Sequence, residues 1–184
     1  LFRQASPRFV KPIDDVFVAR GDILDIKSPE LFAKDSTNLI RAFVLFAAHR
    51  ECKRMSTTLL RSLWHERSSI DTEFRRNPVN KKLFLETLKL KYGPYHFLKN
   101  LNTWGILGRV LSGGRRNVGQ MQHDLFHIYT VDQHTLGVVK FLRRLSHSSY
   151  AHEYPLCSQV LAELAKPWRL TPAGLFHDIA KGRG

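Results

Sequence analysis

The sequences MQHDLFHIYTVDQHTL at residues 121–136 and LTPAGLFHDIAKGRG at residues 170–184 decide how this chain is interpreted. The second contains an adjacent histidine and aspartate, His177 and Asp178, and the first contains a separate histidine, His134. An imidazole nitrogen next to a carboxylate oxygen suits a divalent ion, or a two-metal site that binds phosphate oxygens. The same pair also occurs on ordinary capped helices, so the prediction of a metal site depends on whether His134 converges with it.

Capping motifs predict that these residues lie on helices. Thr130 and Gln133 form a capping box, which predicts a helix that starts at Thr130 and holds His134 in its first full turn. Thr171 followed by Pro172 predicts the start of the last helix, with threonine as the N-cap. The apolar residues expected to bury these helices are Val138, Phe141, Leu142 and Leu145 in the first, and Leu175, Phe176, Ile179 and Ala180 in the second.

The chain before residue 115 is expected to be mostly helical, with one small β-hairpin. Residues 15–20 and 23–26 predict two strands, because Gly21 and Asp22 supply the positive-φ turn of a two-residue hairpin loop. Ser28 followed by Pro29 predicts a short helix that ends near residue 33. Further helices are expected at residues 35–49, from residue 56, at 80–91, from residue 94 and at 158–166. Residues 103–111 are expected to be a short segment that ends at Gly113 and Gly114, and residues 1–13 are expected to be a linker.

The fold class predicted from this pattern is mainly α, a helical bundle-like domain with a short N-terminal β-hairpin followed by a second all-α region. Composition changes near residues 115–120, after which histidines become dense. We therefore expect a helical domain at residues 1–118 and the beginning of a second domain at residues 119–184. A chain of 184 residues is long enough to bury a core in such an arrangement.

The chain is strongly basic, with 29 lysines and arginines against 16 acidic residues and a net charge of +13. Such a balance favours polyanionic partners, including nucleic acid, nucleotides and acidic proteins. The basic residues are scattered in pairs, however, and no single arm or helix holds them all. The charge alone therefore leaves nucleic-acid binding open but makes it the less favoured interpretation. The pairs are Lys53-Arg54, Arg75-Arg76, Lys81-Lys82, Arg115-Arg116 and Arg143-Arg144.

Composition predicts a cytoplasmic protein. The longest apolar run, AFVLFAA at residues 42–48, is much shorter than a membrane span, and the N-terminal residues lack the order of a signal peptide. Two cysteines, Cys52 and Cys157, are too few for a disulfide framework. The chain begins without methionine, so we expect it to be a fragment of a longer protein.

The strings GQMQHDLFHIYTVDQHTL at residues 119–136 and LFHDIAKGRG at residues 175–184 resemble the bacterial bifunctional uridylyltransferase/uridylyl-removing enzymes of nitrogen regulation. Enzymes of that family act on the PII signal-transduction protein. They join a nucleotidyltransferase domain, a helical linker domain, an HD-type hydrolase domain and two sensing domains. The resemblance implies that residues 1–118 are the linker domain and residues 119–184 the truncated start of the HD domain.

The resemblance also implies roles for individual residues. His134 is similar to the first HD-domain histidine, and His177 with Asp178 to the catalytic, metal-binding pair, with Mg²⁺ or Mn²⁺ as the cofactor and UTP and UMP as substrate and product. Lys181 and Arg183 would hold the nucleotide phosphate, although positive charge is also ordinary at a helix C-terminus. The later HD aspartate and the nucleotidyltransferase motif are not in this sequence, so the isolated fragment is expected to be inactive.

The remaining predictions concern the role of His127 and two alternative functions of the chain. His127 is expected either to line the site or to be a buried, hydrogen-bonded histidine. One alternative function is a basic helical module that binds nucleic acid or serves as a scaffold, without metal. The other is an HD-type phosphohydrolase of free nucleotides, which shares the same ligand chemistry.

Overall fold

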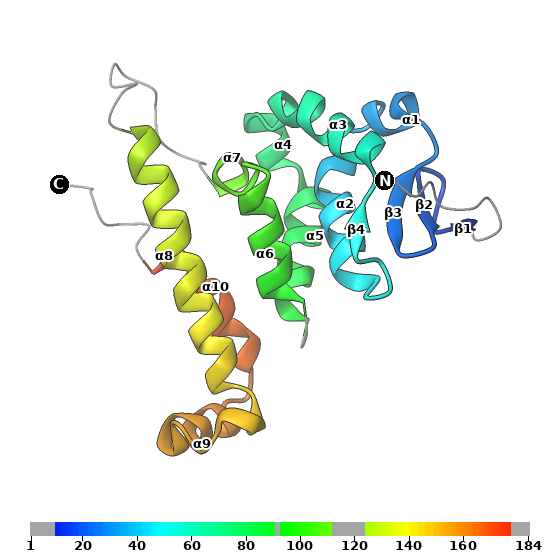
Figure 1. Ribbon diagram of the computed structural model, residues 1–184. Coiled ribbons are helices and arrows are strands. Elements are labelled where there is room, and N and C mark those ends of the chain that lie inside the picture. Colours follow the sequence, from blue (N-terminus) through cyan, green and yellow to red (C-terminus); the bar gives the residue numbers. More distant parts are fainter. Residues whose placement is uncertain (1–9, 91–92, 112–123, 178–184) are drawn as a thin grey trace. The chain divides into compact units, whose positions relative to one another are not determined.

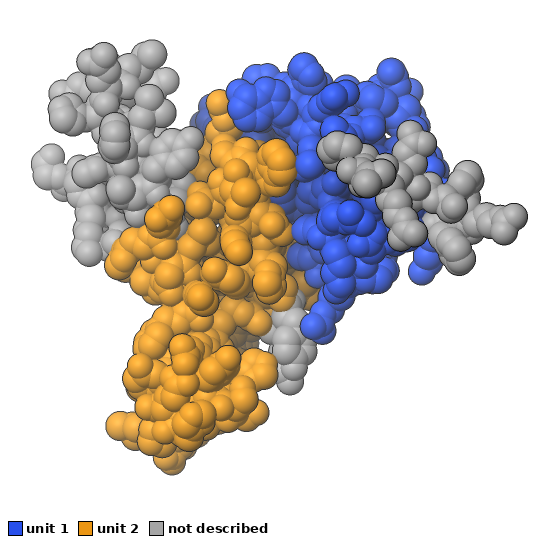
Figure 2. Space-filling model, viewed as in Figure 1, with its two compact units in different colours: residues 1–84 blue, residues 85–184 orange. Residues whose placement is uncertain are grey.

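A computed structural model of the chain describes residues 10–90, 93–111 and 124–177 (Figure 1), and for residues 124–132 the backbone alone. The described chain is mostly helical, with a small N-terminal sheet, which confirms the predicted fold class. Two compact units divide it, residues Leu1–Phe84 and Leu85–Gly184 (Figure 2). Within the described residues, no helix combines the length and the apolar character needed to cross a membrane.

The N-terminal sheet contains the predicted hairpin and two strands that the sequence did not predict. Strands β2 (Phe17–Arg20) and β3 (Ile23–Ile26) pair antiparallel, with Arg20 opposite Ile23, and Gly21 has a φ of 61° in the turn. Strand β1 (Val10–Pro12) pairs antiparallel with β2, so the prediction of a linker throughout residues 1–13 is wrong. Strand β4 (Arg54–Met55) pairs parallel with β3.

Five α-helices follow this hairpin in sequence, and the first, third and fourth of them have a side-chain cap. Helices α1 (Pro29–Ala33), α2 (Asn38–Ala48), α3 (Thr57–Glu66), α4 (Thr72–Arg76) and α5 (Pro78–Lys89) come in that order. The side chain of Ser28 accepts a hydrogen bond from the Leu31 N–H at 3.3 Å, which confirms the predicted cap of α1. Ser56 caps α3 and Asp71 caps α4 in the same way, at 2.9 and 2.8 Å. Each cap satisfies a backbone donor that the helix leaves unpaired.

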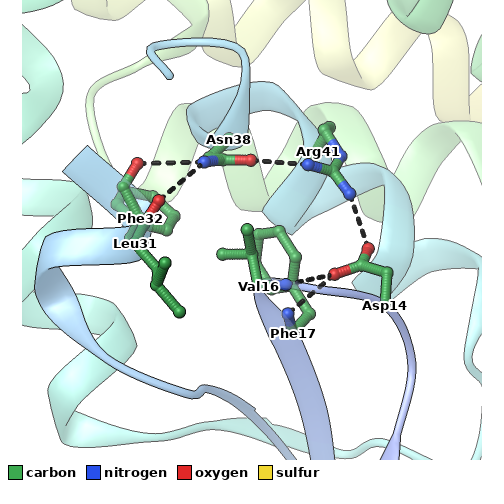
Figure 3. A network of polar contacts seen from close by, with 7 residues as sticks. All are labelled: Asp14, Val16, Phe17, Leu31, Phe32, Asn38 and Arg41. Atoms are coloured by element: carbon green, nitrogen blue, oxygen red, sulfur yellow. Dashed lines mark hydrogen bonds and ion pairs between the residues drawn. The ribbon is translucent and has the colours of Figure 1, made fainter. Parts of the chain in front are cut away.

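A polar network, centred on the buried Asn38 and extending to the partly exposed Arg41 and Asp14, ties the hairpin to helices α1 and α2 (Figure 3). The Asn38 side-chain amide donates to the Phe32 carbonyl oxygen at 3.0 Å and accepts from the Arg41 guanidinium at 2.7 Å. Arg41 also donates to Asp14 at 2.6 Å, and Asp14 accepts from the Phe17 N–H at 2.8 Å. The rings of Phe17 and Phe32 meet edge to face beside it, with centroids 6.1 Å apart. The polar groups of this network therefore form hydrogen bonds with one another, which replace the hydrogen bonds to water that they lose on folding.

Helix α8 (Asp124–Leu145) is the longest element of the second unit, and other helices of that unit pack against it (Figure 1). These are α6 (Pro94–Thr103), α7 (Leu107–Leu111), α9 (Pro155–Glu163) and α10 (Leu170–Phe176). Short 3-10 turns, Ser148–Tyr150 and Pro167–Arg169, precede α9 and α10. The expected domain boundary at residue 118 lies outside the described residues.

Both helix starts predicted from threonine caps in this unit are wrong. Helix α8 begins at Asp124, so Thr130 lies inside it and the capping box does not start the helix. Residues 124–129 contain no helix breaker, and extending an existing helix costs less than nucleating a new one. Helix α10 begins at Leu170 because the 3-10 turn leads directly into it, and Thr171 is buried within its first turn. Pro172 is tolerated there, since first-turn N–H groups have no partner inside the helix.

The apolar faces of α8 and α10 also differ from the prediction. Val139 is fully buried in α8, whereas Phe141 is 44% exposed. Leu145 in α8 and Leu175 in α10 are buried as predicted, but Phe176 is 36% exposed. The remaining two residues predicted to bury the last helix, Ile179 and Ala180, lie outside the described residues.

Candidate functional site

The structure brings His134 and His177 together. His134 lies on α8 and His177 directly follows the last residue of α10, 43 positions later in the sequence. Their Nε2 atoms are 3.3 Å apart and their ring centroids 5.2 Å apart. Both residues are exposed, so a ligand in solution has access to the pair.

Close packing of α10 on α8 produces this meeting. A Cβ atom added at Gly174 would lie 2.7 Å from Leu142 Cδ1 and 3.3 Å from Val138 Cγ1. The absence of a side chain at this position therefore lets the two helices approach until the histidines touch. Val139 and Leu175 are buried in the same helix pair and exclude water from it.

A hydrogen bond orients the His177 ring. Its Nδ1 atom is 2.7 Å from the Gly174 carbonyl oxygen. A carbonyl oxygen only accepts hydrogen bonds, so Nδ1 carries a proton, and in the neutral ring Nε2 is then the nitrogen with the lone pair that faces His134. Histidines that bind metal are commonly held in this way, with the second ring nitrogen bonded to a carbonyl or carboxylate.

The separation of the two nitrogens suits a shared metal ion. Nitrogen ligands at about 2.1 Å from one ion lie roughly 3.0–3.4 Å apart when their bond angle is about 90–109°. The observed 3.3 Å falls in that interval. It also suits a plain hydrogen bond from His134 to the lone pair of His177, so the distance alone does not distinguish the two arrangements.

The other predicted site residues are only partly within the described chain. Asp178, Lys181 and Arg183 lie outside the described residues. His127 is in α8, and its seven-residue separation from His134 corresponds to about two helical turns, which puts both positions on the same face of the helix. No group of three or more metal-binding side chains occurs among the residues that the structure describes.

Gly174 is the contributor to this geometry that the sequence prediction missed. Its carbonyl oxygen orients the His177 ring, and its lack of a side chain allows α8 to pack closely against α10. Its position three residues before His177 was a usable signal, because a side chain can reach the carbonyl one turn earlier.

Part of the basic excess is used in local ion pairs. Arg54 donates to Asp22 at 2.9 Å, and Lys89 donates to Glu86 at 2.6 Å. Arg144 donates to Glu153 at 2.5 Å and also lies over the Tyr150 ring. Surface pairs of this kind lower the charge available to a polyanionic partner without adding much stability.

Comparison with known proteins gives consistent matches. The family described as "Uridylyltransferase GlnD third domain" matches residues 17–110. The bifunctional uridylyltransferase/uridylyl-removing enzyme of Bordetella pertussis is 52% identical over 172 residues, which are 94% of this chain and 20% of that protein. The enzymes of the same name from Ralstonia nicotianae and Cupriavidus pinatubonensis are each 45% identical, over 95% and 98% of this chain and 20% and 21% of their own lengths.

The matched relatives are much longer than this chain, which spans about a fifth of their length. No solved structure matches the chain.

Proposed function

The chain belongs to the family of bifunctional uridylyltransferase/uridylyl-removing enzymes, and we propose that it is the part of such an enzyme that begins the hydrolytic domain. The whole enzyme would transfer a uridylyl group from UTP to the PII protein and would remove it again as UMP. Removal is hydrolysis of the phosphodiester that joins the uridylyl group to a PII tyrosine. Residues 119–184 would contribute to this second reaction.

The meeting of His134 and His177 carries the proposal. Two histidines far apart in sequence are oriented so that their Nε2 atoms face each other at 3.3 Å, and one of them is held by a backbone carbonyl. Together with Asp178 they would hold a divalent ion, Mg²⁺ or Mn²⁺. Such an ion polarises a phosphoryl oxygen and lowers the pKa of a bound water.

Other residues would act on the substrate rather than on the metal. Lys181 and Arg183 follow the pair and would bind the nucleotide phosphate through charge-assisted hydrogen bonds. His127 would line the site from the same helix face as His134. The further ligands that such a centre requires would come from parts of the enzyme outside this 184-residue chain.

The proposal places the enzyme in the cytoplasm, with PII and a nucleotide as its partners. Cys52 and Cys157 are both free thiols, which agrees with a reducing compartment. The family relationship supports a nucleotide substrate, since the relatives are named for uridylyl transfer and removal.

The proposal is tested by His177→Ala in the full-length enzyme. We expect removal of the uridylyl group from PII to fall by at least about 100-fold, because a metal ligand is lost. Uridylyl transfer to PII should stay within about twofold of wild type, since His177 is proposed to serve hydrolysis only. His152→Ala, an exposed histidine in the same unit, is the matched control and should leave both rates unchanged.

Metal binding gives a readout that does not depend on activity. His134→Ala and His177→Ala should each weaken Mn²⁺ binding to the full-length enzyme by about tenfold or more, measured by electron paramagnetic resonance. Unchanged Mn²⁺ affinity in both variants would contradict the ligand assignment and favour the plain hydrogen bond. Hydrolysis of free nucleotides without action on uridylylated PII would instead favour the nucleotide phosphohydrolase.

A further inference from the structure

Helix α9 differs from the other helices of its unit because none of its nine residues, all of which the structure describes, is buried. Two of its aliphatic side chains are widely open to solvent, Leu156 at 71% and Val160 at 51%. Leu164, directly after the helix, is exposed as well. A surface helix of a soluble protein normally turns such residues toward a core.

The exposed apolar residues of α9 form one stripe. Leu156 and Val160 are four residues apart and therefore lie on the same face, and Cys157 lies beside them around the helix. We call Leu156, Cys157 and Val160 the α9 stripe. Ser158, on another face, donates from its hydroxyl to the Leu145 carbonyl oxygen at 3.1 Å and so attaches α9 to the end of α8.

Two aromatic residues provide further exposed apolar surface next to α9. The rings of Phe141 on α8 and Tyr154, which directly precedes α9, meet edge to face with centroids 5.4 Å apart. Both residues are exposed. Apolar surface of this kind, gathered rather than scattered, marks a site of interaction.

We propose that the α9 stripe is the inner face of a helical domain completed by other residues of the same polypeptide, which cover it. The relatives place these 184 residues in a protein about five times as long, so most of the polypeptide remains to supply the cover. A second copy of the chain is the weaker candidate, because each copy carries a net charge of +13 and two copies repel each other. This inference rests on the family and on exposure, and it holds whether or not His134 and His177 bind metal.

The reactivity of the Cys157 thiol measures whether the α9 stripe is covered, because Cys157 lies within the stripe. We expect its thiol to react with a soluble disulfide reagent at least about tenfold more slowly in the full-length enzyme than in the 184-residue chain, because burial blocks the reagent. Cys52 is an internal reference, since burial raises the pKa of its thiol and makes it slow in both proteins.

The matched control moves the thiol to the opposite side of α9. Ala162→Cys in a Cys157→Ser background places an exposed thiol about 140° around the helix from residue 157. It should react within about twofold of the same rate in both proteins. This control separates covering of the stripe from general crowding by a larger protein.

Three results would overturn the proposal. The first is a Cys157 rate that differs by less than threefold between the two proteins. The second is protection in the 184-residue chain that rises with its concentration, which would assign the stripe to a second copy. The third is protection of the full-length enzyme that appears only after PII is added, which would assign the stripe to that partner.

A substitution gives a second, independent measurement. Val160→Asp should lower the melting temperature of the full-length enzyme, because the carboxylate would be forced into an apolar contact. The same substitution should leave the melting temperature of the 184-residue chain unchanged. An equal shift in both proteins would show that residue 160 acts within the described unit and would contradict the proposal.

Discussion

The N-terminal unit and the region from residue 133 to residue 177 differ in how they treat apolar side chains. In the first, Phe17, Phe32 and Phe43 are almost completely buried beside hydrogen-bonded polar groups. In the second, Phe141 and Leu156 are among several large apolar residues open to solvent. Large apolar residues are therefore mostly buried in the first region and more often exposed than buried in the second, although Trp64 is 57% exposed in the first and Val139 is fully buried in the second.

This difference separates the region that holds the fold together from the region that carries the proposed site. The N-terminal unit uses its buried groups to hold a small sheet and short helices together. The C-terminal region uses one well-packed pair of helices, α8 and α10, to set the distance between two histidines. Its remaining apolar surface is open to solvent, so substitutions there should cost little in the 184-residue chain.

The largest contrast should come from the same substitution in both regions. Phe17→Ala should lower the free energy of unfolding by about 3–5 kcal/mol, because it removes a fully buried ring and leaves a cavity. Phe141→Ala should lower it by less than about 1 kcal/mol, since that ring is 44% exposed. Urea denaturation of the 184-residue chain measures both values. Equal costs would show that the two regions are packed alike.

Removal of a buried amide should have the next largest effect. Asn38→Ala leaves the Phe32 carbonyl without its side-chain donor and should cost about 1–3 kcal/mol in urea denaturation. Asn102→Ala in α6 is the matched control, because the Asn102 side chain makes no hydrogen bond to the residues described. Its cost should stay below about 0.5 kcal/mol. A similar cost at both positions would remove the role assigned to the network.

Helix caps sharpen the comparison at a smaller scale. Ser56→Ala should cost about 1 kcal/mol, because Ser56 accepts from the Leu59 N–H and also donates to Asp25. Thr171→Val should cost less than about 0.5 kcal/mol, since α10 has no side-chain cap and threonine lies inside its first turn. Thermal or urea unfolding measures the loss of stability in both variants. A larger loss in Thr171→Val than in Ser56→Ala would indicate that Thr171 does cap α10.

The smallest effect is expected from the surface ion pair between Arg54 and Asp22. Hydrogen bonding by Arg54 lowers the pKa of Asp22 below its ordinary value of 3.8. A carboxyl whose pKa is lower in the folded state than in the unfolded state stabilises the fold fully at a pH above its unfolded-state pKa. This contribution is lost as the pH falls through the folded-state pKa. Arg54→Ala should therefore raise the pKa of Asp22 in an NMR titration, whereas Arg61→Ala should not. An unchanged pKa in Arg54→Ala would contradict the assigned cause.

Much of the fold could be predicted where a few neighbouring residues decide the structure. Gly21 and Asp22 predicted the hairpin turn correctly, and Ser28 the start of α1. The same reasoning gave wrong helix starts at Thr130 and Thr171, because the preceding residues continue into the helix. Strand β4 has only two residues and no alternating pattern of its own, so nothing local predicted it.

For the candidate site, the chemical types follow from the amino-acid sequence: two histidines, an adjacent aspartate, and helices to carry them. The 3.3 Å between His134 and His177, and the part that Gly174 has in it, arise from the packing of α10 on α8. The same packing buries Val139 rather than Phe141 in α8. Capping and turn chemistry act between residues a few positions apart, whereas burial and convergence depend on which distant surfaces pack together.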